Sequence, residues 1–347
     1  MFERLDTNLL IEDPAWIRPF RLLELNAVGV GCLHFMPTAT ELITAQLLPI
    51  LQQALAPRAC QPITDARLLL RRTLEAHANA IGRKRLVIAF VERREISVGG
   101  ADEMLAVSHW LNGQGLQTFV ADPRELEVRN GEIVYKDTTI DVVYRDGALQ
   151  ELISIEQHGG HVEAMKHAFA HNQVVSALTG EFDHKSLFEL LSSPEFAKSF
   201  TPSQRRTFRH CIPWTRLVRA RKTDDIEGQD VDLPDFVRHH RDGLVLKPNR
   251  AYGGQDVAIG RDVTQAMWEE TLQKALSHPD TWVVQAIAGI PQLEFLDGND
   301  AEGVVSEFVT VGFTATHAGI TFVGRSSSER IVNISRGGSL VPLFVVT

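Results

Sequence analysis

The chain has 347 residues, of which 44 % are hydrophobic and 23 % are charged, the composition of a folded protein rather than of a disordered or fibrous one. Thirty-five basic residues against 44 acidic ones give a net charge of −9. The sequence has no block of lysine and arginine residues that could bind the phosphate backbone of a nucleic acid, so we do not expect nucleic acid as a partner. No apolar run approaches the roughly 18–20 residues that a membrane helix needs, so we expect no membrane partner either.

The first 82 residues predict one lobe made of two strands and two helices. Residues 2–10 and 20–28 are rich in leucine and flank a turn-rich stretch, which indicates a pair of strands. Residues 39–55 and 64–81 repeat apolar side chains every three or four positions and predict two helices.

Residues 83–155 predict a small open α/β domain. A strand, a helix and a second strand follow one another and form a βαβ unit, and a hairpin with a further strand comes after them. The predicted elements are a strand at 85–92, a helix at 101–115, a strand at 116–123, a hairpin through Asn130 and Gly131, and a strand at 140–144.

Residues 156–347 carry the remaining elements, in the order helix, connection, strand, glycine-rich turn, strand, helix and further strands. Glycine and polar residues mark the turns between the periodic segments. The predicted elements are helical structure from Glu163 to Ser199, a turn-rich connection over 201–218, strands on both sides of a glycine turn within 243–260, a helix at 264–276, a strand at 281–288 and long strands over 307–326.

The clearest chemical motif is the string LVLKPNRAYGGQDVAIG. Lys247 ends a buried strand, and Gly253 and Gly254 follow in a turn that leads into the next strand. Backbone N–H groups of such a loop can close over phosphates while the lysine supplies a point charge. The alternative is an ordinary glycine hairpin with a surface lysine. The Walker pattern G-x-x-x-x-G-K-[ST] is absent from the chain.

A second lysine extends this motif. Lys185 stands in Asp183-His184-Lys185 ahead of a helix, and the strand VVQAIAGIPQ follows the glycine loop. This order resembles the nucleotide-binding half of the ATP-grasp enzymes. The resemblance implies that Lys185 and Lys247 bind phosphate and that the two glycines form a flap. It also implies an adenine slot and a ribose contact; the residues are Gln285, Ala286, Ile287 and Ala288 for adenine, and Gln292 or Glu294 for ribose.

Two pairs of polar residues interrupt the leucine-rich strands at the start of the chain. Arg4 with Asp6, and Glu24 with Asn26, are each two positions apart, so each pair points to one face of its strand. Carboxylate and amide oxygens are ligands that Mg²⁺ takes, and an arginine beside them suits an intermediate with extra negative charge. The alternative is the solvated outer face of a hairpin.

Taken together, these motifs resemble the circularly permuted ATP-grasp proteins, the group that includes glutathionylspermidine synthase. The metal half, R-x-D and E-x-N, comes first and the nucleotide half follows, while the middle string RLVIAFVE to IDVVYRDG matches the α/β domain of that group. The resemblance implies an α/β (α+β) ATP-grasp fold in permuted order, with an inserted pre-ATP-grasp-like domain. It assigns residues 1–82 to the metal-binding half, 83–155 to the small domain, and 156–347 to the nucleotide-binding lid and the rest of the core.

The resemblance implies an ATP-dependent ligase that joins a carboxylate to an amine through an acylphosphate. Its cofactors are ATP and Mg²⁺, its metal ligands are Asp6, Glu24 and Asn26, and its catalytic residue is Arg4. Near the C-terminus, Arg325 and Arg336 are candidates for binding the substrate carboxylate. The sequence does not indicate which acid or amine is used, nor an oligomeric state.

Two other functions remain open at this point. A dinucleotide-dependent oxidoreductase using residues 85–150 lacks G-x-G-x-x-G, since only Gly99 and Gly100 follow its first strand. The second open function is a non-catalytic nucleotide-binding module with the ATP-grasp fold. The three cysteines, Cys32, Cys60 and Cys211, form no C-x-x-C and are typical of a reducing cytoplasm, where we expect the protein.

Overall fold

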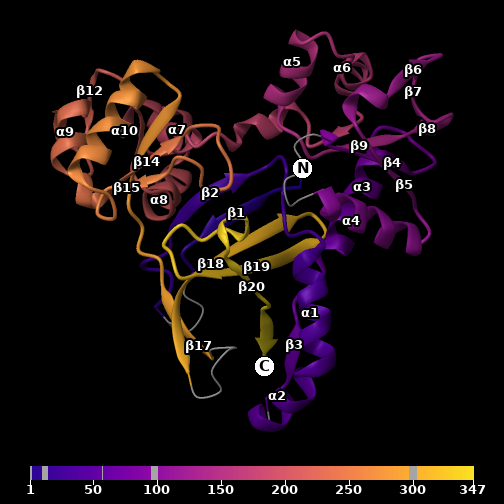
Figure 1. Ribbon diagram of the computed structural model, residues 1–347, viewed down its shortest axis with the longest axis horizontal. Helices are drawn as coiled ribbons and strands as arrows, with labels where there is room; N and C mark the ends of the chain where they lie inside the picture. Colours follow the sequence, from indigo (N-terminus) through magenta and orange to yellow (C-terminus); the bar gives the residue numbers. More distant parts are fainter. Residues whose placement is uncertain (1, 10–14, 57, 95–100, 297–302) are drawn as a thin grey trace.

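The computed structural model describes residues 2–9, 15–56, 58–94, 101–296 and 303–347. It is a mixed α/β fold with several sheets, as the sequence predicts. Figure 1 shows a central sheet with one lobe on each side of it: the lobe drawn in orange on the left and the lobe drawn in magenta on the right. A helical arm descends from the central sheet on the side of the magenta lobe.

The central sheet joins the two ends of the chain. Its strands are β1 (Arg4–Thr7), β2 (Leu22–Asn26), β17 (Gln292–Leu296), β18 (Val304–Thr316), β19 (Gly319–Ser327) and β20 (Ser339–Val341). They run in the order β2-β1-β18-β19-β20, and β17 pairs with the first part of β18. Asp6 lies opposite Glu24 of β2 and Gly312 of β18. The predicted N-terminal strand pair and the long C-terminal strands are thus confirmed.

The left lobe is built on a four-stranded sheet in the order β11-β16-β14-β15. Its core gathers three tryptophans, Trp214, Trp268 and Trp282, with aliphatic side chains. The predicted strand, glycine turn and strand are confirmed here. The elements are α7 (Leu187–Ser192), α8 (Pro202–Cys211), β11 (Thr215–Leu217), β12 (Lys222–Asp224), β13 (Asp230–Asp232), α9 (Leu233–His239), β14 (Leu244–Pro248), β15 (Ala258–Ile259), α10 (Gln265–Ser277) and β16 (Trp282–Ala286).

One expectation for this lobe was wrong, because α8 occupies the segment expected as a turn-rich connection. Thr201 accepts a hydrogen bond from the backbone N–H of Gln204, the Gln204 side chain reaches back to the N–H of Thr201, and Pro202 follows the cap. This capping box satisfies two of the free donors at the helix start. Threonine and proline were interpreted as turn residues, although together with Gln204 they begin a helix.

The right lobe contains a four-stranded parallel sheet in the order β10-β9-β4-β5, which confirms the predicted βαβ unit. The predicted hairpin at Asn130 and Gly131 is also confirmed, as the turn between β6 and β7 of a three-stranded sheet. The elements are α3 (Ala66–Ala80), β4 (Val87–Val91), α4 (Ala101–Gly113), β5 (Gln117–Ala121), β6 (Glu127–Arg129), β7 (Glu132–Tyr135), β8 (Thr138–Ile140), β9 (Val142–Arg145), α5 (Leu149–Gln157), α6 (Glu163–Ala170) and β10 (Val174–Val175).

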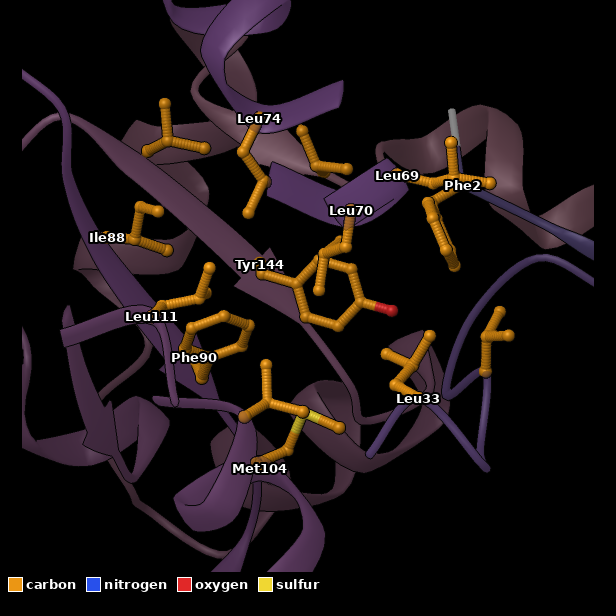
Figure 2. Close-up of a cluster of buried hydrophobic side chains, with 14 of the residues drawn as sticks. Phe2, Leu33, Leu69, Leu70, Leu74, Ile88, Phe90, Met104, Leu111 and Tyr144 are labelled. Atoms are coloured by element: carbon orange, nitrogen blue, oxygen red, sulfur yellow. The ribbon is translucent and has the colours of Figure 1, made fainter. Parts of the chain in front are cut away.

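The core of the right lobe crosses the domain limit expected at residues 82 and 83. Ile88 and Phe90 of β4 pack with Leu70 of α3, and Phe2 and Leu33 belong to the same cluster (Figure 2). Side chains alternate along β4, so its other residues enter a second cluster with α5 and α6. The sheet is therefore buried on both faces, as is usual for parallel strands.

The arm begins with α1 (Phe35–Gln46) and α2 (Leu48–Leu55), where the sequence predicts a single helix over 39–55. Pro49 lies at the start of α2; proline is tolerated in a first helical turn but breaks a continuous helix. A two-stranded ribbon pairs β3 (Cys60–Pro62) with β21 (Phe344–Val346). In the described part of the chain, no helix has both the length and the apolar character needed to cross a membrane.

Candidate functional site

A cavity of about 230 Å³ lies between the central sheet and the left lobe. We call it the central cavity. Strands β1, β2, β18 and β19 supply one wall, and β14, β15 and β16 supply the other. Most of the residues singled out in the sequence line it together, although they come from distant parts of the chain: Asp6, Glu24, Lys185, Lys247, Gly254, Gln285, Ala286, Ile287, Ala288 and Arg325.

The central cavity carries an excess of positive charge in a protein whose net charge is −9. Among its described lining residues are two carboxylates, Asp6 and Glu24. Five basic residues line it as well: Lys185, Lys247, Arg261, Arg325 and Arg330. A cleft lined mainly by one sign of charge attracts ligands of the opposite sign, so this cavity suits an anion with several charges.

Asp6 is the centre of a buried ion-pair cluster. Its Oδ1 accepts a hydrogen bond from Nε of Arg4 at 2.8 Å, and its Oδ2 lies 2.8 Å from Nη2 of Arg325. The Asn26 amide donates to Oδ2 at 3.1 Å. Burial by itself raises the pKa of Asp6, but the charges of Arg325 and Arg4 outweigh burial and hold the pKa well below its usual range.

A glycine makes room for this cluster. Gly312 stands opposite Asp6, and a Cβ at Gly312 would lie 2.5 Å from Oδ1 of Asp6 and 3.0 Å from Cδ of Arg4. Any side chain at this position would displace the pair. The close approach of the two strands therefore depends on glycine.

Lys185 joins the left lobe to the central sheet. Its ammonium lies 2.8 Å from Oε1 of Glu24 and donates to the carbonyl of Ala251 at 2.7 Å. The side chains of Lys185 and Glu24 are 10 % and 29 % exposed, so both can be reached from the cavity. A cation already stands against the carboxylate that the sequence predicts as a metal ligand.

Lys247 occupies the opposite wall. Its ammonium donates to Oε1 of Gln285 at 2.8 Å, and the Gln285 amide donates in turn to Oγ1 of Thr215 at 3.0 Å. Burial lowers the pKa of Lys247 to about 8, while the charge of Glu24 raises it and that of Lys185 lowers it. The lysine is therefore mostly charged at neutral pH, and an anion that enters the cavity would raise its pKa.

The glycine loop packs against the C-terminal part of the chain. Gly253 and Gly254 have φ angles of 68° and 73°, which suit glycine. A Cβ at Gly254 would lie 2.6 Å from Cγ2 of Ile331, and the carbonyl of Gly254 accepts a hydrogen bond from Arg336 at 3.3 Å. Gly253 and Arg336 are not part of the cavity lining. Arg336 thus contacts the glycine loop without lining the cavity.

The structure does not bring the two ribose candidates to the central cavity. Gln292 and Glu294 are exposed on β17, and neither belongs to its lining. The strand after Pro291 turns both side chains to solvent. Their predicted contact with ribose therefore has no support from this arrangement.

Sequence reasoning missed several lining residues, above all Thr310 and Arg330. Thr310 faces Arg325 across β18 and β19, and the Thr310 hydroxyl and Nε of Arg325 are both buried without a hydrogen-bond partner. Buried donors without partners cost free energy and so indicate a place for ligand oxygens. Only the pairing of the two strands places them together. Arg330 lies in the loop after β19. The many hydrogen-bond donors of that segment were the only sequence feature that pointed to a binding role.

These donors fit a polyphosphate, and the oxygens beside them fit Mg²⁺. Asp6, Glu24 and Asn26 offer carboxylate and amide oxygens on two paired strands. Across the described residues, no three His, Cys, Asp or Glu side chains gather as a metal site. A Mg²⁺ ion here therefore needs nucleotide phosphates and water to complete its shell, and it needs Lys185 to release Glu24.

Comparison of the sequence with protein-family models and with curated proteins finds no match. Solved structures do match. A glutathione synthetase-like effector from Globodera pallida aligns with a TM-score of 0.57 at 12 % identity, over 99 % of this chain and 70 % of that one. A protein provisionally assigned as a gamma-glutamylcysteine synthetase from Methylobacillus flagellatus KT aligns with a TM-score of 0.53 at 8 % identity, over 99 % and 80 % of the two chains. This chain is therefore similar in fold to glutathione synthetase-like proteins along almost its whole length.

Proposed function

We propose that the protein is an ATP-dependent ligase of the circularly permuted ATP-grasp type, which joins a carboxylate to an amine. The observation that carries this proposal is the central cavity itself. Asp6 and Glu24 from the first two strands meet Lys185 and Lys247 from the left lobe around one space with surplus positive charge. The fold likeness to two synthetase-like proteins supports the same conclusion.

The triphosphate of ATP would be held by the basic residues of the central cavity. Lys185 and Lys247 neutralise phosphate oxygens, and the hydroxyl of Thr310 and Nε of Arg325 donate to them. Ala286 and Ala288 also line the cavity, and the backbone around them would receive the adenine. The glycine flap closes the phosphate end.

Asp6, Glu24 and Asn26 would hold Mg²⁺. When bound, the ion neutralises charge on the β- and γ-phosphates. Glu24 exchanges its contact with Lys185 for this role, which frees the lysine to bind phosphate. Arg325 and Arg4 keep Asp6 ionised at neutral pH, and a metal ion bound by Asp6 would compete with these two arginines for its oxygens.

The reaction divides one difficult step into two. The substrate carboxylate attacks the γ-phosphorus, which gives an acylphosphate and ADP, and the amine then forms the C–N bond as phosphate leaves. Arg4 is buried beside Asp6. Burial lowers the pKa of Arg4, but the charge of Asp6 and the hydrogen bond that Arg4 donates to Asp6 raise it more strongly, so Arg4 stays cationic. We assign Arg4 to charge stabilisation at the acyl and phosphoryl centres.

The oxidoreductase alternative has no supporting observation. Its Gly99 and Gly100 lie outside the residues that the structure describes. The non-catalytic alternative predicts ATP binding without turnover, so a turnover assay separates it from the ligase.

The decisive experiment measures ADP release from Mg-ATP across pools of carboxylic acids and amines, with Lys247→Ala as the loss-of-binding variant and Lys222→Ala as the matched control. Lys222 is exposed on β12 and lies outside the central cavity. We expect release that needs both an acid and an amine, lost in Lys247→Ala and kept in Lys222→Ala. ATP binding without turnover in any pool would favour the non-catalytic module, and no ATP binding at all would remove the proposal.

A further inference from the structure

The parallel sheet of the right lobe has a switch in strand order at its centre. The chain goes from β4 to β5 on one side and then returns to β9 on the other side of β4, which gives the order β10-β9-β4-β5. In open parallel sheets, ligands bind outside the carboxyl ends of the strands at such a switch point. The carboxyl ends of β4 and β9 are therefore the place to search for a second ligand.

Tyr144 lies in β9, and Asp146 follows the last residue of that strand. Burial, and then the charge of Asp146, raise the pKa of Tyr144 well above its usual value, so the two groups are electrostatic neighbours. The Tyr144 side chain is 0 % exposed, and its hydroxyl has no hydrogen-bond partner. Figure 2 shows this hydroxyl pointing away from Phe90, toward the side on which Phe2 and Leu33 lie. A buried hydroxyl without a partner is costly, and a polar ligand group would satisfy it.

The carboxylate of Asp146 is half-buried, and no described residue donates a hydrogen bond to it or forms an ion pair with it. Its charged neighbours are Glu103 of α4 and Glu151 of α5, which are carboxylates as well. Burial, and then these two charges, raise the pKa of Asp146 to about 6. These three acids concentrate negative charge in one place, in contrast to the cation-rich central cavity.

The two other acids already have structural partners. Glu103 accepts hydrogen bonds from the backbone N–H groups of Cys32 at 2.9 Å and of His34 at 2.9 Å, which fixes the start of α1. Glu151 accepts from the N–H of Ala148 at the start of α5. Asp146 is the carboxylate of the three that is free to bind a cation.

A short glycine loop lies between Asp146 and Arg4. The carbonyl of Gly31 accepts a hydrogen bond from Nη1 of Arg4 at 2.8 Å. Gly29, two residues earlier, comes so close to Asp146 that a Cβ on it would lie 2.8 Å from the Asp146 carbonyl and 3.9 Å from Oδ1. Arg4 and Asp146 thus contact the same short loop, at Gly31 and at Gly29.

We infer that Asp146, with the hydroxyl of Tyr144, forms the binding site for the ammonium group of the amine substrate and accepts its proton before bond formation. This inference rests on the proposed ligase function. The ammonium transfers a proton to the Asp146 carboxylate, which leaves a neutral amine and a carboxylic acid. The nitrogen lone pair then forms the C–N bond, the C–O bond to phosphate breaks, and the leaving phosphate takes the second proton from nitrogen. A protonated amine has no lone pair for this attack, so the step needs a base.

The test uses Asp146→Asn, which keeps the shape of the side chain and removes its charge. Asp137→Asn is the matched control, since Asp137 is exposed in the turn between β7 and β8 of the same lobe. We expect Asp146→Asn to bind Mg-ATP and to form acylphosphate, trapped with hydroxylamine, at the parent rate. Amide formation should fall at least a hundredfold, with a raised KM for the amine, and Asp137→Asn should match the parent.

The pH profile and a second variant separate chemistry from structure. In the parent, amide formation should rise with pH through a midpoint near 6, as Asp146 ionises beside Glu103, Glu151 and Tyr144; this limb should vanish in Asp146→Asn. Tyr144→Phe removes only the hydroxyl and keeps the packing of the ring, so we expect a severalfold rise in KM for the amine with little change in stability. Parent rates of amide formation in Asp146→Asn would overturn the inference.

Failure of the inference and failure of the ligase function are distinguishable. A parent protein that forms no acylphosphate contradicts the ligase proposal, while the amine site is still decided by binding of n-butylamine, followed by ligand-observed NMR. Binding that Asp146→Asn loses supports the site. Binding that is equal in both proteins, or absent from the parent, overturns it.

Discussion

The ammonium of Lys185 lies 2.8 Å from Oε1 of Glu24, although one residue comes from the second strand and the other from the middle of the chain. Both residues line the central cavity, where the metal and the phosphates are expected to meet. It is also a contact that has to break, because Glu24 cannot hold Lys185 and Mg²⁺ with the same oxygen. Lys185 and Glu24 thus pair with each other in the free protein. Binding of a nucleotide and its metal would replace this ion pair with contacts to phosphate and to Mg²⁺.

Replacing Lys247 by alanine should weaken ATP binding at least tenfold. The variant leaves the triphosphate with one compensating charge fewer, and it leaves Oε1 of Gln285 without its donor. Calorimetric titration with Mg-ATP measures the change, and the ATP-induced rise in Tm should shrink in parallel. An affinity equal to that of Lys222→Ala would show that Lys247 does not contact the nucleotide.

The affinity for ATP should fall as pH rises above about 8. Free Lys247 has a pKa lowered to about 8, chiefly by burial, and a bound triphosphate stabilises its charged form and raises that pKa. Binding above this pH therefore takes up a proton. Titrations in buffers of different ionisation enthalpy should reveal the uptake in the parent and none in Lys247→Ala; equal proton uptake in both would assign the effect to another group.

Gly254→Ala should weaken ATP binding through the flap. The new Cβ would lie 2.6 Å from Cγ2 of Ile331, and the alanine would have to keep the backbone φ of 73°. Gly131→Ala is the matched control, because Gly131 has a φ of 77° with nothing within 4 Å of its Cβ position. Both variants should lose about 1 kcal/mol of unfolding free energy from the backbone alone. Gly254→Ala alone should lose ATP affinity as well. An equal loss of affinity in both variants would show that the glycine loop does not contact ATP.

Glu24→Gln should raise the Mg²⁺ concentration needed for ATP binding. The change removes one charge from the proposed ligand set but keeps one oxygen and the shape of the side chain. Titrating Mg²⁺ at fixed ATP measures the shift. Glu294→Gln serves as the control, since Glu294 is exposed on β17 outside the cavity. If Glu294→Gln raised the Mg²⁺ requirement as much as Glu24→Gln does, the specific role of Glu24 would be contradicted.

Arg4→Ala should lower both stability and turnover. Asp6 keeps Arg325 and Asn26 as partners, so we expect a loss of about 1–3 kcal/mol rather than complete unfolding. Acylphosphate formation should fall at least a hundredfold while ATP binding stays near the parent value, because the negative charge that we assign Arg4 to stabilise develops only during the reaction. Urea unfolding and hydroxylamine trapping measure the two effects; parent-level trapping would transfer the role to Arg325.

The sequence predicted the parts of the site whose geometry is local. Arg4 with Asp6, and Glu24 with Asn26, share faces because side chains alternate along a strand, and the structure places Asp6 opposite Glu24. Thr310 was not predicted, because nothing near it in the chain marks it, and only pairing of β18 with β19 places it beside Arg325. Gln292 was assigned to the nucleotide from its order in a motif, whereas the direction of β17 decides that it faces solvent.

The pairing of β1 with β18 has a consequence for how the protein is made. Leu5 lies opposite Phe313, so the first strand leaves the ribosome long before its neighbour exists. Contacts between such distant segments form slowly, because a long loop must close before they contribute stability. A nascent chain that stops before β18 presents β1 and β2 with an open edge and leaves Asp6 without Arg325. We therefore expect fragments that lack the last strands to be degraded or aggregated rather than partly active.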